Sequence, residues 1–464
     1  MDNLWVLTEE RPKPSVILQI VEMYCKDFND QITRKEEIKI KPIIENGYFK
    51  FVYEVEGLRV EKAKKILIKT VSGNSSFLDF LLFKQEEEPT EGCKTDNLLM
   101  AIEETKTSDD ESRNTGVYQR GSKFVYIKPY YNSAKLYMLY NEELEAREDK
   151  KPSDTSMFGT NILLTLGVTI VGKDINKWFK PFVSLEDLIR FKQGMRRPPA
   201  GNIPIEITKY DDRIEISGRL AKPAYAGNIG HDPNIGALSM ISACIRKLGW
   251  TKDIVITRHG VSQSYVTNTK GKNKFLYICS ILGMKLDGIE MPSNVVLPDL
   301  YWHYEKTSEK MTSILLHVLC LYNGFNTVYE NHAGCERGYF RPKGGQLVTL
   351  PKKDKHGENL YLPDVVLYDP KSDIVILVEG KQLSTLANGI EEIKYYDSIE
   401  NEYIKPAYHS ASVYRCVSIF GGLAKTTHLH DDVLIYMNND GEIFINEKAP
   451  ECIKSIFRKT GVKV

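Results

Sequence analysis

The stretch Leu362–Gln382 carries the residues best suited to chemistry. It has the pattern of two apolar strands joined by a short turn: Asp364 opens the first strand, and Glu379 and Lys381 end the second. Residues two apart on a strand point to the same face, so Glu379 and Lys381 project together. If the strands pair as a hairpin, Asp364 lies near Glu379. We therefore expect two carboxylates and one ammonium group to converge at the end of a buried sheet.

This set of groups suits a hard divalent cation. Mg²⁺ prefers oxygen ligands, keeps several waters and usually takes only one or two protein carboxylates. A lysine beside the metal can orient or deprotonate a water, and it can stabilise negative charge that develops on a phosphate. These features predict a Mg²⁺-dependent phosphodiester hydrolase, with Asp364 and Glu379 as metal ligands and Lys381 as the catalytic cation.

At these residues the sequence resembles the PD-(D/E)XK nuclease superfamily, and in particular the type II restriction endonucleases. Pro363-Asp364 matches the PD element and Glu379-Gly380-Lys381 matches E-x-K. An amphipathic helix expected over Glu305–Tyr322 and a helix expected over Gly389–Ile399 also fit that core. The resemblance implies a restriction-endonuclease-like fold and sequence-specific cleavage of double-stranded DNA.

Members of the superfamily sometimes carry a further metal-binding acid near the start of the first helix. Glu305 and Glu309 hold that position in this chain. The alternative interpretation is that both are solvent-facing charges at the start of a helix.

A second E-x-K motif ends another apolar strand. The bare pattern is weak, because it occurs five times in the chain, but only Glu104 and Glu379 follow an apolar strand that has an aspartate-bearing strand upstream. Here Asp79 lies within Phe77–Phe83, and Glu104 and Lys106 end Leu98–Lys106. Leu78 replaces the proline, which is often absent in the family. The resemblance implies a second catalytic set, with Asp79 and Glu104 as metal ligands. The neighbouring Glu103 should face the opposite side of the strand from Glu104.

Two such sets in one chain would have a physical use. Both strands of a duplex are cut by two sites of opposite polarity, which most restriction enzymes obtain by homodimerisation. A chain with two different sites would cut each strand with a different site and would be free to read an asymmetric sequence. Separate substitution of Lys106 and Lys381 should then give two strand-specific nicking enzymes.

Polar and basic segments beside the two motifs are candidates for DNA contact, since such side chains bind phosphates and base edges. After the first motif, and in the loop before Pro363, the DNA-binding candidates are Arg113, Asn114, Gln119, Arg120, Arg337, Arg341 and Lys343. For the segment after the first motif, an exposed loop before a helix is the alternative.

The elements that must position these groups alternate between strands and helices. This pattern predicts an α/β fold of mixed central sheets flanked by helices, with one or two restriction-endonuclease-like cores. We expect an N-terminal nuclease-like domain over residues 1–194, a middle DNA-contact region over 195–300, and a C-terminal PD-(D/E)XK nuclease domain over 301–464. The linker-like sequence Met195–Asn202 marks the first boundary.

Composition limits the class of protein. The 464 residues carry 62 Lys+Arg and 62 Asp+Glu, so any DNA-binding surface must be local and offset elsewhere. No apolar run approaches the length of a membrane helix and no signal peptide is evident, which predicts a cytoplasmic protein. None of the eight cysteines forms a CxxC pair, which disfavours a zinc knuckle.

The leading hypothesis is a Mg²⁺-dependent type II restriction endonuclease, monomeric or homodimeric, with a DNA methyltransferase encoded nearby. One alternative keeps a single active site and makes the N-terminal half a DNA-recognition domain. Another is a catalytically inactive DNA-binding protein, against which the intact Asp364, Glu379 and Lys381 weigh. A repair or transposition nuclease shares the same core motif.

Overall fold

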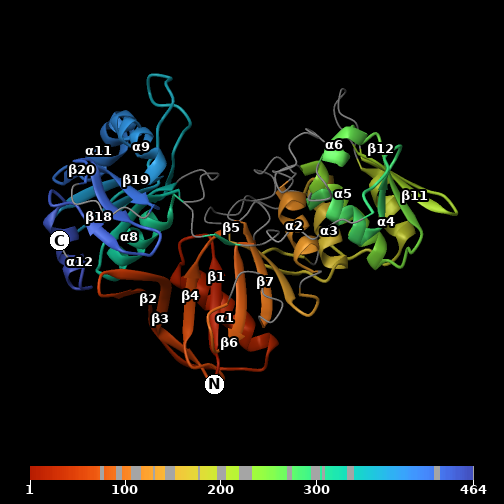
Figure 1. Ribbon diagram of the computed structural model, residues 1–464, viewed down its shortest axis with the longest axis horizontal. Coiled ribbons are helices and arrows are strands. Elements are labelled where there is room, and N and C mark those ends of the chain that lie inside the picture. The colour runs from red at the N-terminus through yellow and green to blue at the C-terminus, as the bar shows by residue number, and fades with distance from the viewer. Residues whose placement is uncertain are drawn as a thin grey trace. The chain divides into compact units, whose positions relative to one another are not determined.

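The computed structural model divides into two compact units (Figure 1). The first comprises Met1–Ser72, Lys84–Glu88 and Glu305–Val464, and the second comprises Gly73–Phe83 and Pro89–Tyr304. These bounds differ from the three consecutive segments expected from the sequence, because the first 72 residues join the C-terminal part of the chain. The residues that the structure describes are 1–73, 78–89, 97–105, 116–128, 131–141, 152–175, 178–195, 205–218, 233–268, 274–293, 304–305, 309–331, 339–422 and 429–462.

The first unit holds two groups of strands. One has the order β2-β3-β4-β1, and the other is a six-stranded sheet with the order β15-β18-β19-β20-β21-β22. The strands are β1 (Asn3–Thr8), β2 (Ile32–Glu45), β3 (Tyr48–Val60), β4 (Ile66–Thr70), β15 (Asn326–Glu330), β16 (Tyr339–Phe340), β17 (Val348–Thr349), β18 (Val365–Asp369), β19 (Ile374–Gln382), β20 (Ser412–Phe420), β21 (Val433–Met437) and β22 (Ile443–Ile445).

Helices connect and cover these strands. They are α1 (Pro14–Asp27), α8 (Met311–Tyr322), η2 (Leu383–Thr385), α9 (Leu386–Glu392), η3 (Ile393–Tyr396), α10 (Asp397–Ile399), η4 (Glu400–Ile404), α11 (Lys405–Ala407) and α12 (Glu451–Arg458). The two-residue strands β5 (Ser72–Gly73) and β14 (Tyr304–Glu305) lie at two of the points where the chain passes between the units.

The six-stranded sheet is buried, which explains the apolar runs in its sequence. Every residue of β18 is buried, and β19 is buried from Val375 to Gly380. A strand that is enclosed on both faces has a continuous run of apolar residues in its sequence instead of alternating apolar and polar residues. Helix α8, which packs against this sheet, is likewise buried from Met311 to Cys320. In Figure 1 this part of the chain is blue, with α8 in dark green beside it.

The N-terminal segment is tied to the C-terminal sheet within the first unit. Arg11 forms an ion pair with Glu330 on β15 at 2.5 Å. Tyr322 at the end of α8 donates a hydrogen bond to Glu56 on β3 at 3.0 Å. The rings of Phe51 and of Phe420 on β20 meet in a T-shaped arrangement. These contacts make the first 72 residues part of the structure that supports the C-terminal motif.

The second unit also contains two groups of strands, in the orders β6-β7-β8-β9 and β10-β11-β12-β13. The strands are β6 (Phe80–Gln85), β7 (Leu98–Thr105), β8 (Lys135–Tyr140), β9 (Thr169–Val171), β10 (Glu206–Lys209), β11 (Arg213–Ser217), β12 (Asp253–Thr257) and β13 (Met284–Leu286). The helices are α2 (Gly116–Ile127), α3 (Asp154–Thr165), α4 (Leu185–Gly194), α5 (Pro233–Lys247), α6 (Gln263–Asn268) and α7 (Lys274–Leu282).

The same local topology surrounds each motif. Strands β6 and β7 pair antiparallel, and β7 is followed by helix α2 and by the parallel strand β8. Strands β18 and β19 pair antiparallel, and β19 is followed by the helical segment α9–α11 and by the parallel strand β20. The expected α/β class with mixed sheets and flanking helices is confirmed.

One expected helix begins later than its pattern suggested. Helix α8 starts at Met311 instead of Glu305, and Glu305 belongs to the short strand β14. The stretch Glu305–Lys310 is mostly polar or charged, and the apolar residues that α8 buries begin at Met311. Within the described ranges, no helix combines the length and apolar character that crossing a membrane demands.

Candidate active site

Asp364 and Glu379 meet at the end of the β18–β19 pair. The register aligns Val365 with Val378, so the preceding residue Asp364 stands across from Glu379. The backbone N–H of Gly380 donates a hydrogen bond to Asp364 Oδ2 at 2.9 Å. Both carboxylates are buried. The strand pair thus brings together the two acids that the sequence predicted would converge.

Two lysines and the hydroxyl of a tyrosine contact this acid pair. Lys381 donates to Glu379 Oε1 at 2.7 Å and forms a second ion pair with Glu392 on α9, also at 2.7 Å. The hydroxyl of Tyr396 on η3 donates to Glu379 Oε2. On the other acid, Lys310 lies 3.2 Å from Asp364 Oδ1. Each carboxylate therefore has a cation and a neutral donor within reach.

Two glycines let the neighbouring elements approach this closely. A Cβ on Gly380 would lie 2.9 Å from Asp364 Oδ2 and 3.0 Å from Ser313 Oγ on α8. A Cβ on Gly389 of α9 would lie 2.7 Å from Cγ of Lys381. Real Cβ atoms do not tolerate such contacts, so glycine at these positions permits the packing of α8 and α9 around the acids.

Burial and mutual repulsion change the protonation of these groups. Burial, together with the charge of Asp364, raises the pKa of Glu379 to about 7. Burial also raises the pKa of Asp364, although Lys310 and the Gly380 N–H oppose the shift. Burial lowers the pKa of Lys381, but its bonds to Glu379 and Glu392 outweigh this effect and raise it above its ordinary value. Lys381 is thus held as an ammonium ion.

The donors at this site fit the preferences of Mg²⁺. Among the residues that the structure describes, no cluster of three or more His, Cys, Asp and Glu side chains is arranged to hold a metal ion. The pair Asp364 and Glu379 supplies two carboxylates, which is the number that Mg²⁺ usually takes from a protein. A cation between the two buried acids would offset the charge of Asp364 that raises the pKa of Glu379.

The second motif is assembled differently from its expected form. The register of β6 and β7 aligns Phe80 with Ile102, which places Asp79 across from Glu103 and not from Glu104. The side chain of Glu104 accepts a hydrogen bond from Asn141 at 2.8 Å, while its backbone N–H donates to Asp79 Oδ2 at 2.6 Å. The expected pairing of Asp79 with the Glu104 side chain is corrected, because a shift of one residue moves a side chain to the other face.

A lysine from helix α2 contacts this second acid pair. Lys123 donates to Glu103 Oε1 at 2.7 Å, and the Lys123 side chain is 15% exposed. Burial and the charge of Asp79 raise the pKa of Glu103 to about 8, against the opposing charges of Lys123 and Arg120. The predicted DNA-contact residue Arg120 therefore lies near the acid pair, with its Nη1 atom buried and without a hydrogen-bond partner.

The remaining predicted site residues fall into two groups. Arg341 and Lys343 are exposed between β16 and β17, and Lys343 donates to the hydroxyl of Tyr368 at 3.1 Å. Gln119 is half-buried on α2. The predictions on Lys106, Arg113, Asn114 and Arg337, and on the side chain of Glu305, lie outside the described residues.

Glu309 is described and half-buried in the turn before α8. The residue after it, Lys310, reaches Asp364 instead. A cation rather than a further acid is therefore the contact observed from the start of this helix.

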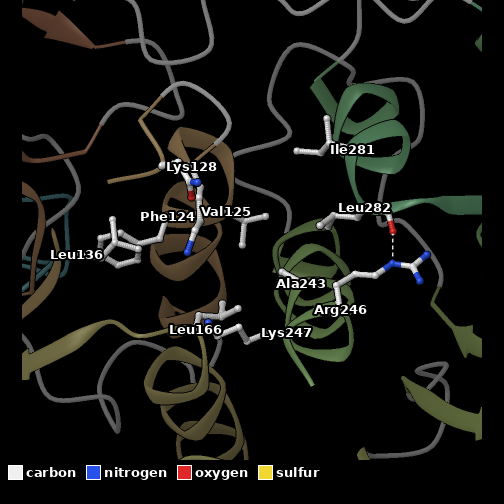
Figure 2. Close-up of a pocket in the computed structure, with 11 residues that line it drawn as sticks. Phe124, Val125, Lys128, Leu136, Leu166, Ala243, Arg246, Lys247, Ile281 and Leu282 are labelled. Carbon is white, nitrogen blue, oxygen red and sulfur yellow. Dashed lines mark hydrogen bonds between the residues drawn. The ribbon is translucent and has the colours of Figure 1, made fainter. Parts of the chain in front are cut away.

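A separate pocket of about 530 Å³ lies among α2, β8, α3, α5 and α7 in the second unit (Figure 2). Its lining is largely apolar and includes Phe124, Leu136 and Ile281, with Lys128 and Lys247 as cations. Arg246 also lines it, but its Nε donates to the carbonyl of Leu282 at 2.6 Å. No acid is among the lining residues that the structure describes, so these residues offer no carboxylate to a metal ion.

The sequence did not predict four residues at the two acid pairs. Glu103 is the partner of Asp79, and the side chains of Lys310, Tyr396 and Lys123 contact the acids. Lys310 and Tyr396 come from a turn and from a crossover helix, outside the motif. A usable signal existed for Lys123, since Arg120 and Lys123 are spaced to share one face of the expected helix over Val117–Val125.

Comparison of the chain with protein-family models, with curated proteins and with solved structures finds no match.

Proposed function

We propose that this protein is a Mg²⁺-dependent endonuclease that cleaves double-stranded DNA at specific sequences, in the manner of a type II restriction endonuclease. The observation that carries the proposal is the convergence of Asp364, Glu379 and Lys381 at the end of one buried strand pair. The polarity and spacing of these groups follow the PD and E-x-K elements that the sequence resembles. Buried acids opposite each other are costly, and a divalent cation offsets that cost.

Each residue has a separate role in this proposal. Asp364 and Glu379 would hold Mg²⁺, which when bound supplies a Lewis acid that activates water and neutralises phosphate charge. Lys381, held as an ammonium ion, stabilises negative charge on the phosphate and orients the attacking water. Tyr396 fixes the orientation of Glu379 through its hydrogen bond, and Lys310 balances Asp364.

A DNA partner requires a local basic surface on this chain. With a net charge of zero, affinity has to come from a local basic surface, to which the exposed Arg341 and Lys343 would contribute. A cytoplasmic location and a methyltransferase encoded nearby go with the restriction role.

The test is incubation of the full chain with phage DNA in the presence of Mg²⁺ or of EDTA. Discrete fragments that require Mg²⁺ support a specific endonuclease, and a smear supports a non-specific one. Intact DNA in Mg²⁺, together with a gel shift in Ca²⁺, would contradict the nuclease and support the inactive DNA-binding protein. The matched control is Lys381→Ala, which should bind DNA in Ca²⁺ but lose cleavage at the C-terminal site.

A further inference from the structure

The acid pair in the second unit repeats the backbone geometry of the C-terminal pair. In both, an aspartate precedes a strand and accepts a hydrogen bond from a backbone N–H on the neighbouring antiparallel strand. The donor is the residue that follows the opposing glutamate: Gly380 after Glu379, and Glu104 after Glu103. This correspondence aligns Glu103 with Glu379 and Thr105 with Lys381.

The ammonium group reaches the second pair by another route. Thr105, at the position that matches Lys381, is buried and offers no charge. Lys123 instead extends from α2, the crossover helix between β7 and β8, to Glu103 Oε1. In the first unit the corresponding crossover supplies Tyr396, whose hydroxyl contacts Glu379 Oε2.

One oxygen of the second pair is left without a hydrogen bond. Glu103 is 1% exposed, and its Oε2 atom is buried without a partner, whereas the equivalent oxygen of Glu379 receives the Tyr396 hydroxyl. A buried carboxylate oxygen without a partner carries its full desolvation cost. A cation beside Asp79 and Glu103 would supply the missing interaction, and the two acids present the oxygen donors that Mg²⁺ or Mn²⁺ selects.

We propose that Asp79 and Glu103 bind a second divalent cation, and that Lys123 does in this unit what Lys381 does in the other. The inference rests on the proposed nuclease function and extends it to a second active site that cuts the other DNA strand. In the reaction, a water oxygen joins phosphorus and the bond from phosphorus to the sugar oxygen breaks. One proton of the water ends on the sugar hydroxyl, and the other is released to solvent.

The first readout is metal binding by the full chain, measured as Mn²⁺ bound per chain by electron paramagnetic resonance. The wild-type protein should bind about two ions in its two carboxylate pairs. Glu103→Gln should lose one of them, while the matched variant Glu104→Gln should retain both because that side chain faces Asn141. Equal binding by Glu103→Gln and wild type, or loss of an ion in Glu104→Gln alone, would overturn the inference.

The second readout is strand-specific cleavage of a plasmid with one recognition site. Lys123→Ala should slow the cutting of one strand by about 10²–10⁴-fold and leave the other strand's rate unchanged. Unchanged cutting of both strands by Lys123→Ala would overturn the second site and leave the C-terminal site standing. If wild-type protein itself leaves DNA intact in Mg²⁺, the nuclease proposal fails, and the Mn²⁺ measurement still decides whether Asp79 and Glu103 bind metal.

Discussion

The two acid pairs use one backbone arrangement but differ in what surrounds it. At the C-terminal pair, the residue between the acid and the lysine is Gly380, and the N-terminal turn of α8 packs directly on it. At the second pair the same register position holds Glu104, whose side chain bonds Asn141. The difference teaches that the strand register sets where the acids meet, whereas the lysine on each glutamate has a different source: Lys381 comes from strand β19 itself, and Lys123 comes from the crossover helix α2.

The largest expected effect is on catalysis at the C-terminal pair. Lys381→Ala removes the ammonium group beside Glu379, and we expect the cleavage rate of one strand to fall about 10²–10⁴-fold. Lys394→Ala is the matched control, because Lys394 ends another E-x-K match and pairs with Glu391 on the exposed helix. Rates on a plasmid substrate measure both. Equal losses in the two variants would contradict a special role for Lys381.

The pH dependence of stability compares the two glutamates directly. Because their pKa values are raised on folding, to about 7 for Glu379 and about 8 for Glu103, the metal-free protein loses stability as pH rises from about 4.5 to those values. Glu379→Gln should therefore stabilise the protein in EDTA at pH 9 by about 2–3 kcal/mol and have little effect at pH 4. Glu103→Gln should gain more, since its Oε2 has no hydrogen bond to lose.

Urea unfolding at pH 4 and pH 9 checks this pair of variants. A stabilisation that is the same at both pH values, or a destabilisation at pH 9, would contradict the raised pKa values. Addition of Mg²⁺ should stabilise the wild-type protein at pH 9 more than either variant, because binding to the folded state favours it.

A smaller effect is expected at the residue that follows each glutamate, which is Gly380 at the C-terminal pair and Glu104 at the second pair. Gly380→Ala puts a Cβ within 3.1 Å of the carbonyl of Glu309 as well as against Asp364, and should cost about 1–3 kcal/mol of stability. Cleavage should slow too, because Asp364 has to shift. The corresponding variant Glu104→Ala introduces no new contact. A Gly380→Ala protein with unchanged unfolding midpoint and cleavage rate would show that the close approach of α8 is unimportant.

The smallest effect is expected at the exposed loop between β16 and β17. Arg341→Ala should weaken DNA binding by a similar factor on all sequences and reduce the dependence of log Kd on log salt by about one unit, provided that it contacts a phosphate. Titrations in Ca²⁺ at several salt concentrations measure the slope. Loss of discrimination between cognate and unrelated DNA would instead indicate that Arg341 reads bases.

The sequence predicted the C-terminal pair well because its information is local. Asp364 and Glu379 lie on two apolar strands joined by a short turn, so pairing follows from the turn alone. At the second pair, 24 residues separate Asp79 from Glu104, and this distance leaves the register open by one residue. A shift of one residue in the register decides which glutamate lies across from Asp79, and in the structure it is Glu103 instead of Glu104.

Side chains from outside the motifs depended on tertiary packing. Lys310 approaches Asp364 because α8 starts at Met311 and packs on the sheet, whereas the helix expected from Glu305 drew attention only to Glu305 and Glu309. Tyr396 and Lys123 reach the glutamates from crossover segments, and the spacing of Arg120 and Lys123 predicts that they share a helix face but not that this face meets the acid pair. The division into two units likewise could not be predicted from the sequence, because it depends on contacts between residues far apart in the chain, such as Arg11 and Glu330.

The most direct test of the central claim is strand mapping with two aspartate variants, Asp364→Asn and Asp79→Asn, on a plasmid that carries one recognition site. Our account predicts that each variant, in Mg²⁺, converts supercoiled plasmid to the nicked circle, and that the two variants nick opposite strands. If Asp364→Asn leaves both strands uncut while Asp79→Asn cuts both at the wild-type rate, the chain has one active site and the two acid pairs do not share a function.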